Sequence, residues 1–426
     1  MNVKISLSLC LFSFMVDAYA LTFDQALDQA IGYDKKYASA IYDARSAEYL
    51  TVVGRAGLLP KITLTGFQAN NNLTQNQPGV FGGVSTTQQN YTAQSYAAQL
   101  TQPLLNLSAI ASYLQSSNQE RAAQQKLRIE LNDLKYKVID GYCSLALAQE
   151  SYSDTAKELN ALIVQEKIVI ARQLAGVSSK TDIEEVDYAL LQTRANLDDA
   201  KNALIQAKIG LEKLIGTRLS IRELLEVPQV NLPIDINLGD LINSVKSTSP
   251  KILYQKNNLE VAIYENKKNK GAYVPNVDVV AYQGYQNSNS LSTIGQKSAQ
   301  GYIGLQLNIP LITGGETYGK ERQSAFNVES QRMLLESEIN DAEELVKKQY
   351  FQVKSSNEKL LTLRYQVQVA DRLYVSFLKQ KELGLKSTYD LLIATRRKFQ
   401  SERDLNKSKY EQIQAVRKLE ITMEGF

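Results

Sequence analysis

The sequence contains no histidine and no tryptophan among its 426 residues. Histidine is the commonest general base of enzymes and the commonest ligand of transition metals, so its absence strongly disfavours triad and metal-dependent chemistry. No clustered set of nucleophile, base and metal ligands can be assembled from the residues that remain. We therefore expect no enzymatic activity, no metal site and no cofactor. The net charge of +3, from 48 basic and 45 acidic residues, gives no reason to expect nucleic acid as a partner.

Cysteine is nearly absent as well, because only Cys10 and Cys143 occur. Residues 1–20 have the basic residue, apolar stretch and small-x-small cleavage site of a signal peptide, at Lys4, Ile5 to Val16, and Ala18-Tyr19-Ala20. The apolar stretch is far shorter than the roughly 20 residues of a spanning helix. Cleavage would leave a mature chain that begins at Leu21 with Cys143 as its single thiol. A single thiol forms no internal disulfide, and we expect it to be buried as a small apolar residue.

Proline occurs only eight times, and its spacing marks where long helices fit. The stretches 104–227 and 311–426 lack it, are rich in good helix formers, and carry apolar residues at helical spacing. Each is interrupted once by a glycine followed by serine, which predicts two antiparallel helical hairpins over about 105–216 and about 316–425. A helix of nearly 70 residues would be on the order of 100 Å long, so it must pack against a partner helix and other chains. After Leu21 no apolar window of about 20 residues occurs, so we expect no membrane-spanning helix.

Charged residues are missing from two further segments. There is no Asp, Glu, Lys or Arg from Ile62 to Gln119, and only Lys297 from Val279 to Gly315. Apolar residues there alternate with polar or small ones at a period of two, most clearly at Ile303, Leu305, Leu307, Ile309 and Leu311. We predict four strands in two hairpins, over about 61–103 and 275–311, with polar loops at Asn70 to Asn90 and Asn287 to Ala299.

Strands of about ten uncharged residues with alternating polarity and several tyrosines are typical of a transmembrane barrel, which faces lipid outside and water inside. An aqueous β-sandwich is the alternative, although its outer face normally carries charged residues. Four strands cannot close a barrel, because the smallest bacterial examples need about eight. The membrane interpretation therefore requires several copies of the chain to share one barrel.

The two halves of the chain repeat each other, because three motifs of the first half recur in the same order in the second. The pairs are Gly57 to Leu64 with Ala272 to Val279, Gln102 to Leu104 with Ile309 to Leu311, and Gly176, Ser179 and Asp182 with Gly384, Ser387 and Asp390. Each repeat would contain a helix, a strand hairpin and a helical hairpin. We predict a first repeat over 21–232 and a second over 233–426, with the boundary in the proline-marked linker from Glu226 to Asn237.

These motifs resemble those of the TolC-type outer membrane efflux family, and the likeness covers nearly the whole mature chain. It is carried by Leu21 to Leu27, Gly57 to Pro60, Gln102 to Leu104, Gly176 to Asp182, Tyr273 to Pro275, Ile309 to Leu311, and Leu383 to Asp390. The resemblance implies a mainly α-helical homotrimer. Each chain would give four strands to a shared twelve-stranded barrel in the outer membrane, and coiled-coil-like helical hairpins would continue the barrel into the periplasm.

The resemblance also implies a function and partners. It predicts the outer membrane channel of a tripartite efflux pump or of a type I secretion system, a passive conduit for small molecules or polypeptides. Outer membrane lipid, a periplasmic adaptor and an inner membrane transporter of the ABC, RND or MFS type would be its partners, and the transporter would supply the free energy. A secreted coiled-coil adaptor or structural protein is the alternative. It accounts for the long helices, but not for the charge-poor windows or the duplication.

Gating roles near the two helical turns follow from the same resemblance. Asp182 falls where the family has a gating carboxylate, Lys386 replaces a gating arginine, and Lys381 replaces an aromatic partner. Asp390 matches one of the acidic rings that narrow the pore, while Ile393 occupies the second ring position, so any cation-binding constriction should be weaker. The alternative is that the two aspartates only cap helices, because Ser-x-x-Asp has the spacing of a capping box.

Docking of the adaptor is the last role that the resemblance assigns. In the family the adaptor hairpins meet the helical turns, which here are Gly176, Val177, Ser178, Gly384, Leu385 and Lys386. Exposed small and apolar residues at a helical turn are otherwise ordinary, so this role depends on the resemblance alone.

Overall fold

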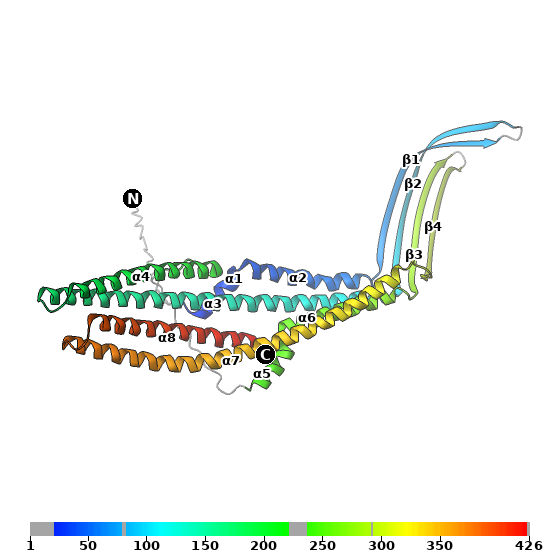
Figure 1. Ribbon diagram of the computed structural model, residues 1–426. Coiled ribbons are helices and arrows are strands. Elements are labelled where there is room, and N and C mark those ends of the chain that lie inside the picture. The colour runs from blue at the N-terminus through cyan, green and yellow to red at the C-terminus, as the bar shows by residue number, and fades with distance from the viewer. Residues whose placement is uncertain (1–20, 79–81, 221–236, 291–292, 424–426) are drawn as a thin grey trace, which may run out of the picture. The chain divides into compact units, whose positions relative to one another are not determined.

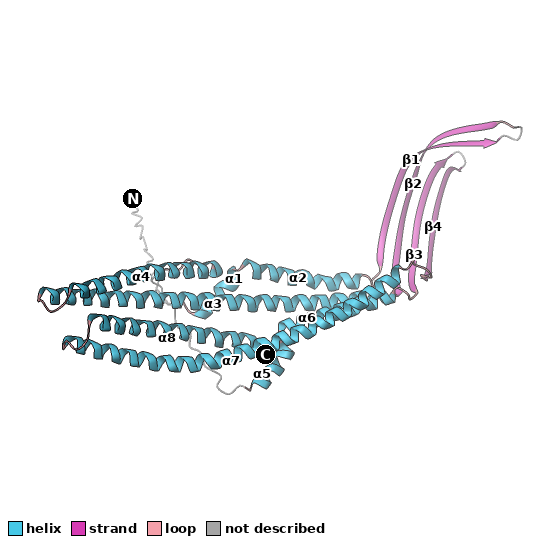
Figure 2. Ribbon diagram, in the orientation of Figure 1, coloured by secondary structure: helices cyan, strands magenta, loops and turns pink. Residues whose placement is uncertain are grey.

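The structure is a computed structural model in which residues 21–78, 82–220, 237–290 and 293–423 are described (Figure 1). The predicted signal peptide and most of the predicted linker between the repeats lie outside these residues. The described residues form eight helices, α1 to α8, and four strands, β1 to β4, with helix predominating (Figure 2).

Two long helical hairpins account for most of the helix. The first pairs α3 (Leu107–Leu174) with α4 (Lys180–Ile215), and the second pairs α7 (Glu316–Glu382) with α8 (Thr388–Met423). At 1.5 Å per residue, the 68 residues of α3 extend about 100 Å. The long helical hairpins predicted from the spacing of proline are confirmed. No helix in the described ranges combines the length and the apolar character that crossing a membrane requires.

A pair of shorter helices precedes each pair of strands. The helices α1 (Phe23–Tyr33) and α2 (Lys35–Ala56) lead into β1, and α5 (Leu238–Thr248) and α6 (Pro250–Gly271) lead into β3. The first pair breaks at Asp34, whose backbone is extended and whose carboxylate accepts a 2.7 Å hydrogen bond from the Tyr37 N–H. The second breaks before Pro250, because proline fits the first position of a helix but cannot continue one. The sequence predicted a helix before each strand pair but not these breaks.

The four strands form one antiparallel sheet in the order β1-β2-β3-β4, with bounds β1 Lys61–Pro78, β2 Val84–Leu105, β3 Asn276–Ser290 and β4 Thr293–Asn308. The prediction of four strands is confirmed, but the predicted loops at 70–90 and 287–299 are wrong in extent. Both segments pair almost to their ends, and in the first a polar side chain also bonds across the strands. Thr92 Oγ1, for example, donates to Asn70 Oδ1 at 2.9 Å. Polar composition alone had indicated a loop.

The pairing of β2 with β3 joins the two halves of the chain. Tyr96 lies opposite Tyr285 and Leu100 opposite Ala281, in a register that runs to a β-bulge after Pro103. This order leaves β1 and β4 as edges that pair with no further strand of the described chain. Several large apolar side chains of the sheet are exposed, among them Ile62, Leu64, Ile303, Leu305 and Leu307. Unpaired edges and apolar surface of this kind call for a covering outside the single chain.

The chain divides into two compact units, and each unit draws on both sequence halves. One unit consists of Ala40–Ile129 and Lys246–Ala342 and contains the sheet. The other consists of Met1–Ser39, Glu130–Val245 and Glu343–Phe426 and contains the turns of both helical hairpins. The division follows spatial contacts, so the predicted repeats of 21–232 and 233–426 stay a prediction about sequence.

Apolar packing holds the helices of the unit that contains the turns. The α1 helix packs into the α3–α4 hairpin on a core that includes Val138, Tyr142, Leu211 and Ile215, and the Tyr142 hydroxyl donates a 2.6 Å hydrogen bond to the Leu21 carbonyl. An adjacent face of α3 packs against α8 through Ile139, Cys143, Ala146, Tyr410, Ile413 and Ile421. Each valine, leucine or isoleucine among them contributes roughly 1.5–3 kcal/mol when it is fully buried. Burial raises the pKa of the Cys143 thiol to about 12, so the cysteine is a protonated core residue, as expected.

Candidate functional site

The two helical turns have the same backbone geometry. Three backbone hydrogen bonds close each turn, with the N–H groups of Ala175, Gly176 and Val177 donating in the first and those of Leu383, Gly384 and Leu385 in the second. Gly176 and Gly384 have φ angles of +74° and +75°, in the left-handed region that favours glycine at the end of a helix. The predicted interruptions are therefore glycine-terminated helix ends, and a side chain at either glycine would be strained.

The predicted docking residues all lie on these turns. Val177 and Leu385 are 69 % and 70 % exposed, while Ser178 and Lys386 are half-buried. A Cβ added at Gly176 or at Gly384 would meet nothing within 4 Å, so both glycines border open space. Leu174 and Leu383 add two more exposed apolar side chains. The predicted docking set left out both leucines, although Leu383 belongs to the second turn motif.

A serine and an aspartate cap the helix that follows each turn. At the start of α4 the Ser179 N–H donates to Asp182 Oδ2 at 2.8 Å, and the Asp182 N–H donates to Ser179 Oγ at 3.1 Å. At the start of α8, Ser387 and Asp390 make the same two bonds, at 3.1 and 3.0 Å. The spacing of Ser-x-x-Asp thus predicted both capping boxes. Capping alone, however, does not distinguish the two aspartates.

Asp182 makes one further contact, which crosses from the first hairpin to the second. The Thr388 hydroxyl lies close enough to the Asp182 carboxylate to lower its pKa, and Lys381 Nζ donates to Thr388 Oγ1 at 2.7 Å. Thr388 is completely buried. The hydroxyl of Thr388 is the largest cause that lowers the pKa of Asp182, followed by the bonds from Ser179 and by the charge of Lys381. We call Asp182, Thr388 and Lys381 the cross-hairpin network.

The other predicted gating residues stay within the second hairpin in a single chain. The pKa of Asp390 is also lowered, first by the Ser387 N–H and then by the Ser387 hydroxyl and by the charges of Lys386 and Lys381. Lys386 Nζ lies over the ring of Phe377, 4.8 Å from its centroid, a cation–π contact. The structure therefore joins Asp182 with Lys381 but not with Lys386. The sequence missed Thr388, because a threonine at the first position of a helix carries no distinguishing pattern.

Ile393, at the second ring position, lies in a different setting. It lines a cavity of about 460 Å³ together with Tyr188 and Glu184 of α4 and Tyr389 of α8. The side chain that replaces a second acidic ring is thus part of the wall between the two hairpins. This position holds an apolar group where a carboxylate would be needed to bind a cation.

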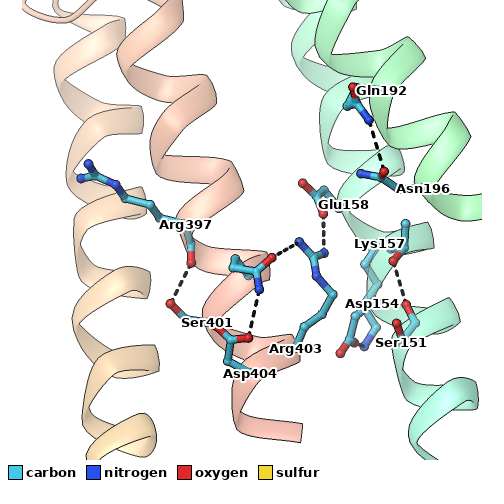
Figure 3. Close-up of polar contacts among 12 residues, drawn as sticks. Ser151, Asp154, Lys157, Glu158, Gln192, Asn196, Arg397, Ser401, Arg403 and Asp404 are labelled. Carbon is cyan, nitrogen blue, oxygen red and sulfur yellow. Dashed lines mark hydrogen bonds and ion pairs between the residues drawn. The ribbon is translucent and has the colours of Figure 1, made fainter. Parts of the chain in front are cut away.

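A polar ladder joins the hairpins farther along, between α3 and α8. Arg403 points toward Glu158 and pairs with it at 2.5 Å (Figure 3). One and two turns away along α3, Asp154 accepts from Asn406 Nδ2 at 2.8 Å and Glu150 accepts from the Tyr410 hydroxyl at 2.9 Å. Asp154 and Glu158 are buried despite their charge. Because buried charges need paired, hydrogen-bonded partners, the ladder fixes the register of one hairpin against the other.

The comparisons with known proteins agree with this architecture. The outer membrane efflux protein family matches residues 26–217 and 241–423. The chain therefore belongs to the outer membrane efflux protein family. It is an outer membrane channel with a long periplasmic helical tunnel, acting in efflux or type I secretion. The TolC-type resemblance and the predicted localisation are confirmed.

Individual relatives cover nearly the whole chain. The chain is 25 % identical to the proteases secretion protein PrtF of Dickeya chrysanthemi, with 95 % of this chain and 88 % of that protein covered. It is 23 % identical to the alkaline protease secretion protein AprF of Pseudomonas aeruginosa, with 95 % and 84 % covered. Among solved structures, the Campylobacter jejuni CmeC outer membrane channel superposes with a TM-score of 0.81 at 15 % identity, over 95 % of this chain and 85 % of that one. That likeness concerns the fold.

Proposed function

We propose that this chain is the outer membrane duct of a type I secretion system and that it exports a polypeptide. The observation that carries the proposal is its similarity over 95 % of its length to PrtF and AprF, two proteins named for protease secretion. The duct is passive, and the chain itself catalyses no reaction. An inner membrane transporter of the ABC type supplies the free energy.

The duct is a homotrimer in this proposal. A sheet of four strands with two unpaired edges and exposed apolar side chains is incomplete by itself, because hydrocarbon tolerates no open strand edge. Three copies would give twelve strands, an even number within the range of bacterial barrels. Uncharged strands over 62–105 support contact with outer membrane lipid on the outside of the barrel.

The helical turns contribute the gate and the docking surface. We assign the closed state to the cross-hairpin network of Asp182, Thr388 and Lys381, because it ties the start of α4 to the end of α7 and the start of α8. Lys386 and Asp390 flank the network and are assigned to the constriction. Exposed apolar side chains at both turns, including Val177 and Leu385, support docking of a periplasmic adaptor.

The cargo is tested by deleting the gene and measuring secreted protein and drug sensitivity in the same strain. We expect a polypeptide to disappear from the culture medium and to return when the wild-type chain is supplied. Sensitivity to dyes and antibiotics should change little. A strain that secretes normally but becomes drug-sensitive would assign the duct to small-molecule efflux and contradict the proposed cargo. A chain that fractionates as a soluble monomer would contradict the duct itself.

A further inference from the structure

Arg172 and Gln380 occupy equivalent positions in the two turns, yet their side chains behave differently. The carbonyl of Arg172 accepts from the Val177 N–H, and the carbonyl of Gln380 accepts in the same way from the Leu385 N–H. The amide of Gln380 then bonds within its own helix, donating to Ser376 Oγ at 3.2 Å. The guanidinium of Arg172 instead crosses to the second hairpin. The two turns therefore share one backbone geometry, but only the first has a side chain that bonds to the other hairpin.

The Arg172 guanidinium caps the carboxyl end of α7. One of its NH2 groups donates to the Lys381 carbonyl at 3.2 Å, and the other donates to the Glu382 carbonyl at 3.4 Å. These carbonyls belong to the last turn of a helix of 67 residues, whose end carries a partial negative charge, and the Lys381 carbonyl also accepts from the Gly384 N–H at 3.1 Å. A cation at this end is favourable, and hydrogen bonds from a charged donor are stronger than neutral ones. Arg172 is also half-buried, which limits screening by water.

Lys381 connects this cap to the cross-hairpin network. Its carbonyl accepts from Arg172, and its Nζ donates to Thr388, whose hydroxyl lies close enough to Asp182 to lower the pKa of that carboxylate. One residue of the second hairpin is thus held through its main chain by α3 and through its side chain by the network that ends on α4. Both helices of the first hairpin reach the same point of the second.

From this geometry we infer that Arg172 is a positioning residue of the gate. By capping α7 from α3, it holds the backbone of Lys381 where the ammonium group reaches Thr388, and it thereby favours the closed state. The inference rests on the proposed gating function of Asp182. It adds a second tie between the hairpins, made by a residue that carries no gating assignment from the sequence.

The test is single-channel conductance of the purified full chain in planar bilayers. In Arg172→Ala the open fraction should rise about tenfold, since about 1.4 kcal/mol, less than one charge-assisted hydrogen bond, corresponds to a factor of ten. Arg172→Lys should have an open fraction between those of the wild type and Arg172→Ala, because an ammonium cannot donate in a planar fork to two carbonyls. Arg172→Gln, which copies the residue at the equivalent position, should behave like the alanine variant and serves if alanine fails to assemble.

Arg194→Ala is the matched control. Arg194 is an exposed arginine of α4, and the structure records no bond from it to the second hairpin within the described residues. It should leave the open fraction unchanged. If the Arg172 variants close as well as the wild type while Asp182→Asn opens, the role of Arg172 is overturned and the gate is retained. If Asp182→Asn also stays closed, the proposed gating function of Asp182 fails together with the role of Arg172. A wild type that forms no channel would contradict the proposed duct itself.

Discussion

At the scale of single residues, the two turns differ in what their capping aspartates contact. Asp182 and Asp390 make the same capping bonds, but only Asp182 is also influenced by Thr388 on the other hairpin, which lowers the pKa of its carboxylate. The sequence predicted the caps because they depend on local spacing. It could not predict Thr388 or Arg172, because their contacts depend on which hairpins meet in space. The equivalent positions in the other turn show the same backbone without these contacts.

The pH dependence of the channel should identify the gating carboxylate. Bonds from Thr388 and Ser179 hold the pKa of Asp182 below its ordinary value of 3.8. A group with a lowered pKa favours the closed state above its ordinary pKa, and this contribution is lost as the pH falls through the lowered pKa. We expect conductance to stay low from neutral pH down to about pH 4 and to rise below it.

Two substitutions separate the gate from the cap in that experiment. Asp182→Asn should conduct at every pH and lose the step. Ser179→Ala should keep the step, because Thr388 still lowers the pKa of Asp182, while the loss of its cap destabilises α4 by about 1 kcal/mol. A step that survives in Asp182→Asn would assign the titration to another group, with Asp390 as the first candidate because its pKa is also lowered.

At the scale of helices, α3 makes two kinds of contact with its neighbours: apolar packing in the cores and the polar ladder with α8. Proline spacing and helical periodicity predicted the hairpins, since both are local properties of the chain. The ladder was not predicted, because Glu150, Asp154 and Glu158 have the spacing of an ordinary solvated helix face. Only their pairing with α8 shows that this face is buried.

Removing one partner of the buried ion pair should destabilise the helical unit. Glu158→Ala leaves Arg403 largely buried without its carboxylate, with an expected loss of about 3 kcal/mol, the lower end for such pairs because Arg403 is 22 % exposed. The double variant Glu158→Leu with Arg403→Leu should recover most of this loss. Loss of helical circular dichroism with denaturant in detergent measures both.

An exposed ion pair provides the control for that series. Lys348 and Glu344 pair within α7 with side chains 72 % and 61 % exposed. Glu344→Ala should therefore leave the stability almost unchanged, because water screens an exposed pair. Equal losses for Glu344→Ala and Glu158→Ala would show that the ladder contributes no more than a surface pair.

At the scale of the whole molecule, the exclusion of charge carried most of the predictive information. Charge-free windows and a period of two predicted four strands, because lipid forbids charge on one face of every strand. They did not predict that β2 pairs with β3, nor that the asparagine-rich segment after Asn70 continues β1. Register and strand length depend on pairing across the halves, which no local pattern records.

A charge on the apolar face of the sheet should block assembly in the membrane. Leu305 of β4 is 72 % exposed in the single chain and alternates with Gln306 on the opposite face. Leu305→Arg should cost about 2–4 kcal/mol near the middle of the bilayer, whereas Gln306→Arg should be tolerated because it faces water. The amount of oligomer in outer membrane fractions, compared on gels before and after heating, measures the difference. Equal loss with both variants would contradict the assignment of faces.

The unpaired edges of β1 and β4 also have a genetic consequence. In the proposed trimer each copy would complete its neighbours on both sides, so one copy with a damaged edge would leave a gap that two intact copies cannot close. In a cell that makes both versions, mixed rings would outnumber wild-type rings once the damaged version is common. We expect such a mutation to be dominant-negative. A mutation that only prevents a chain from leaving the cytoplasm should be recessive.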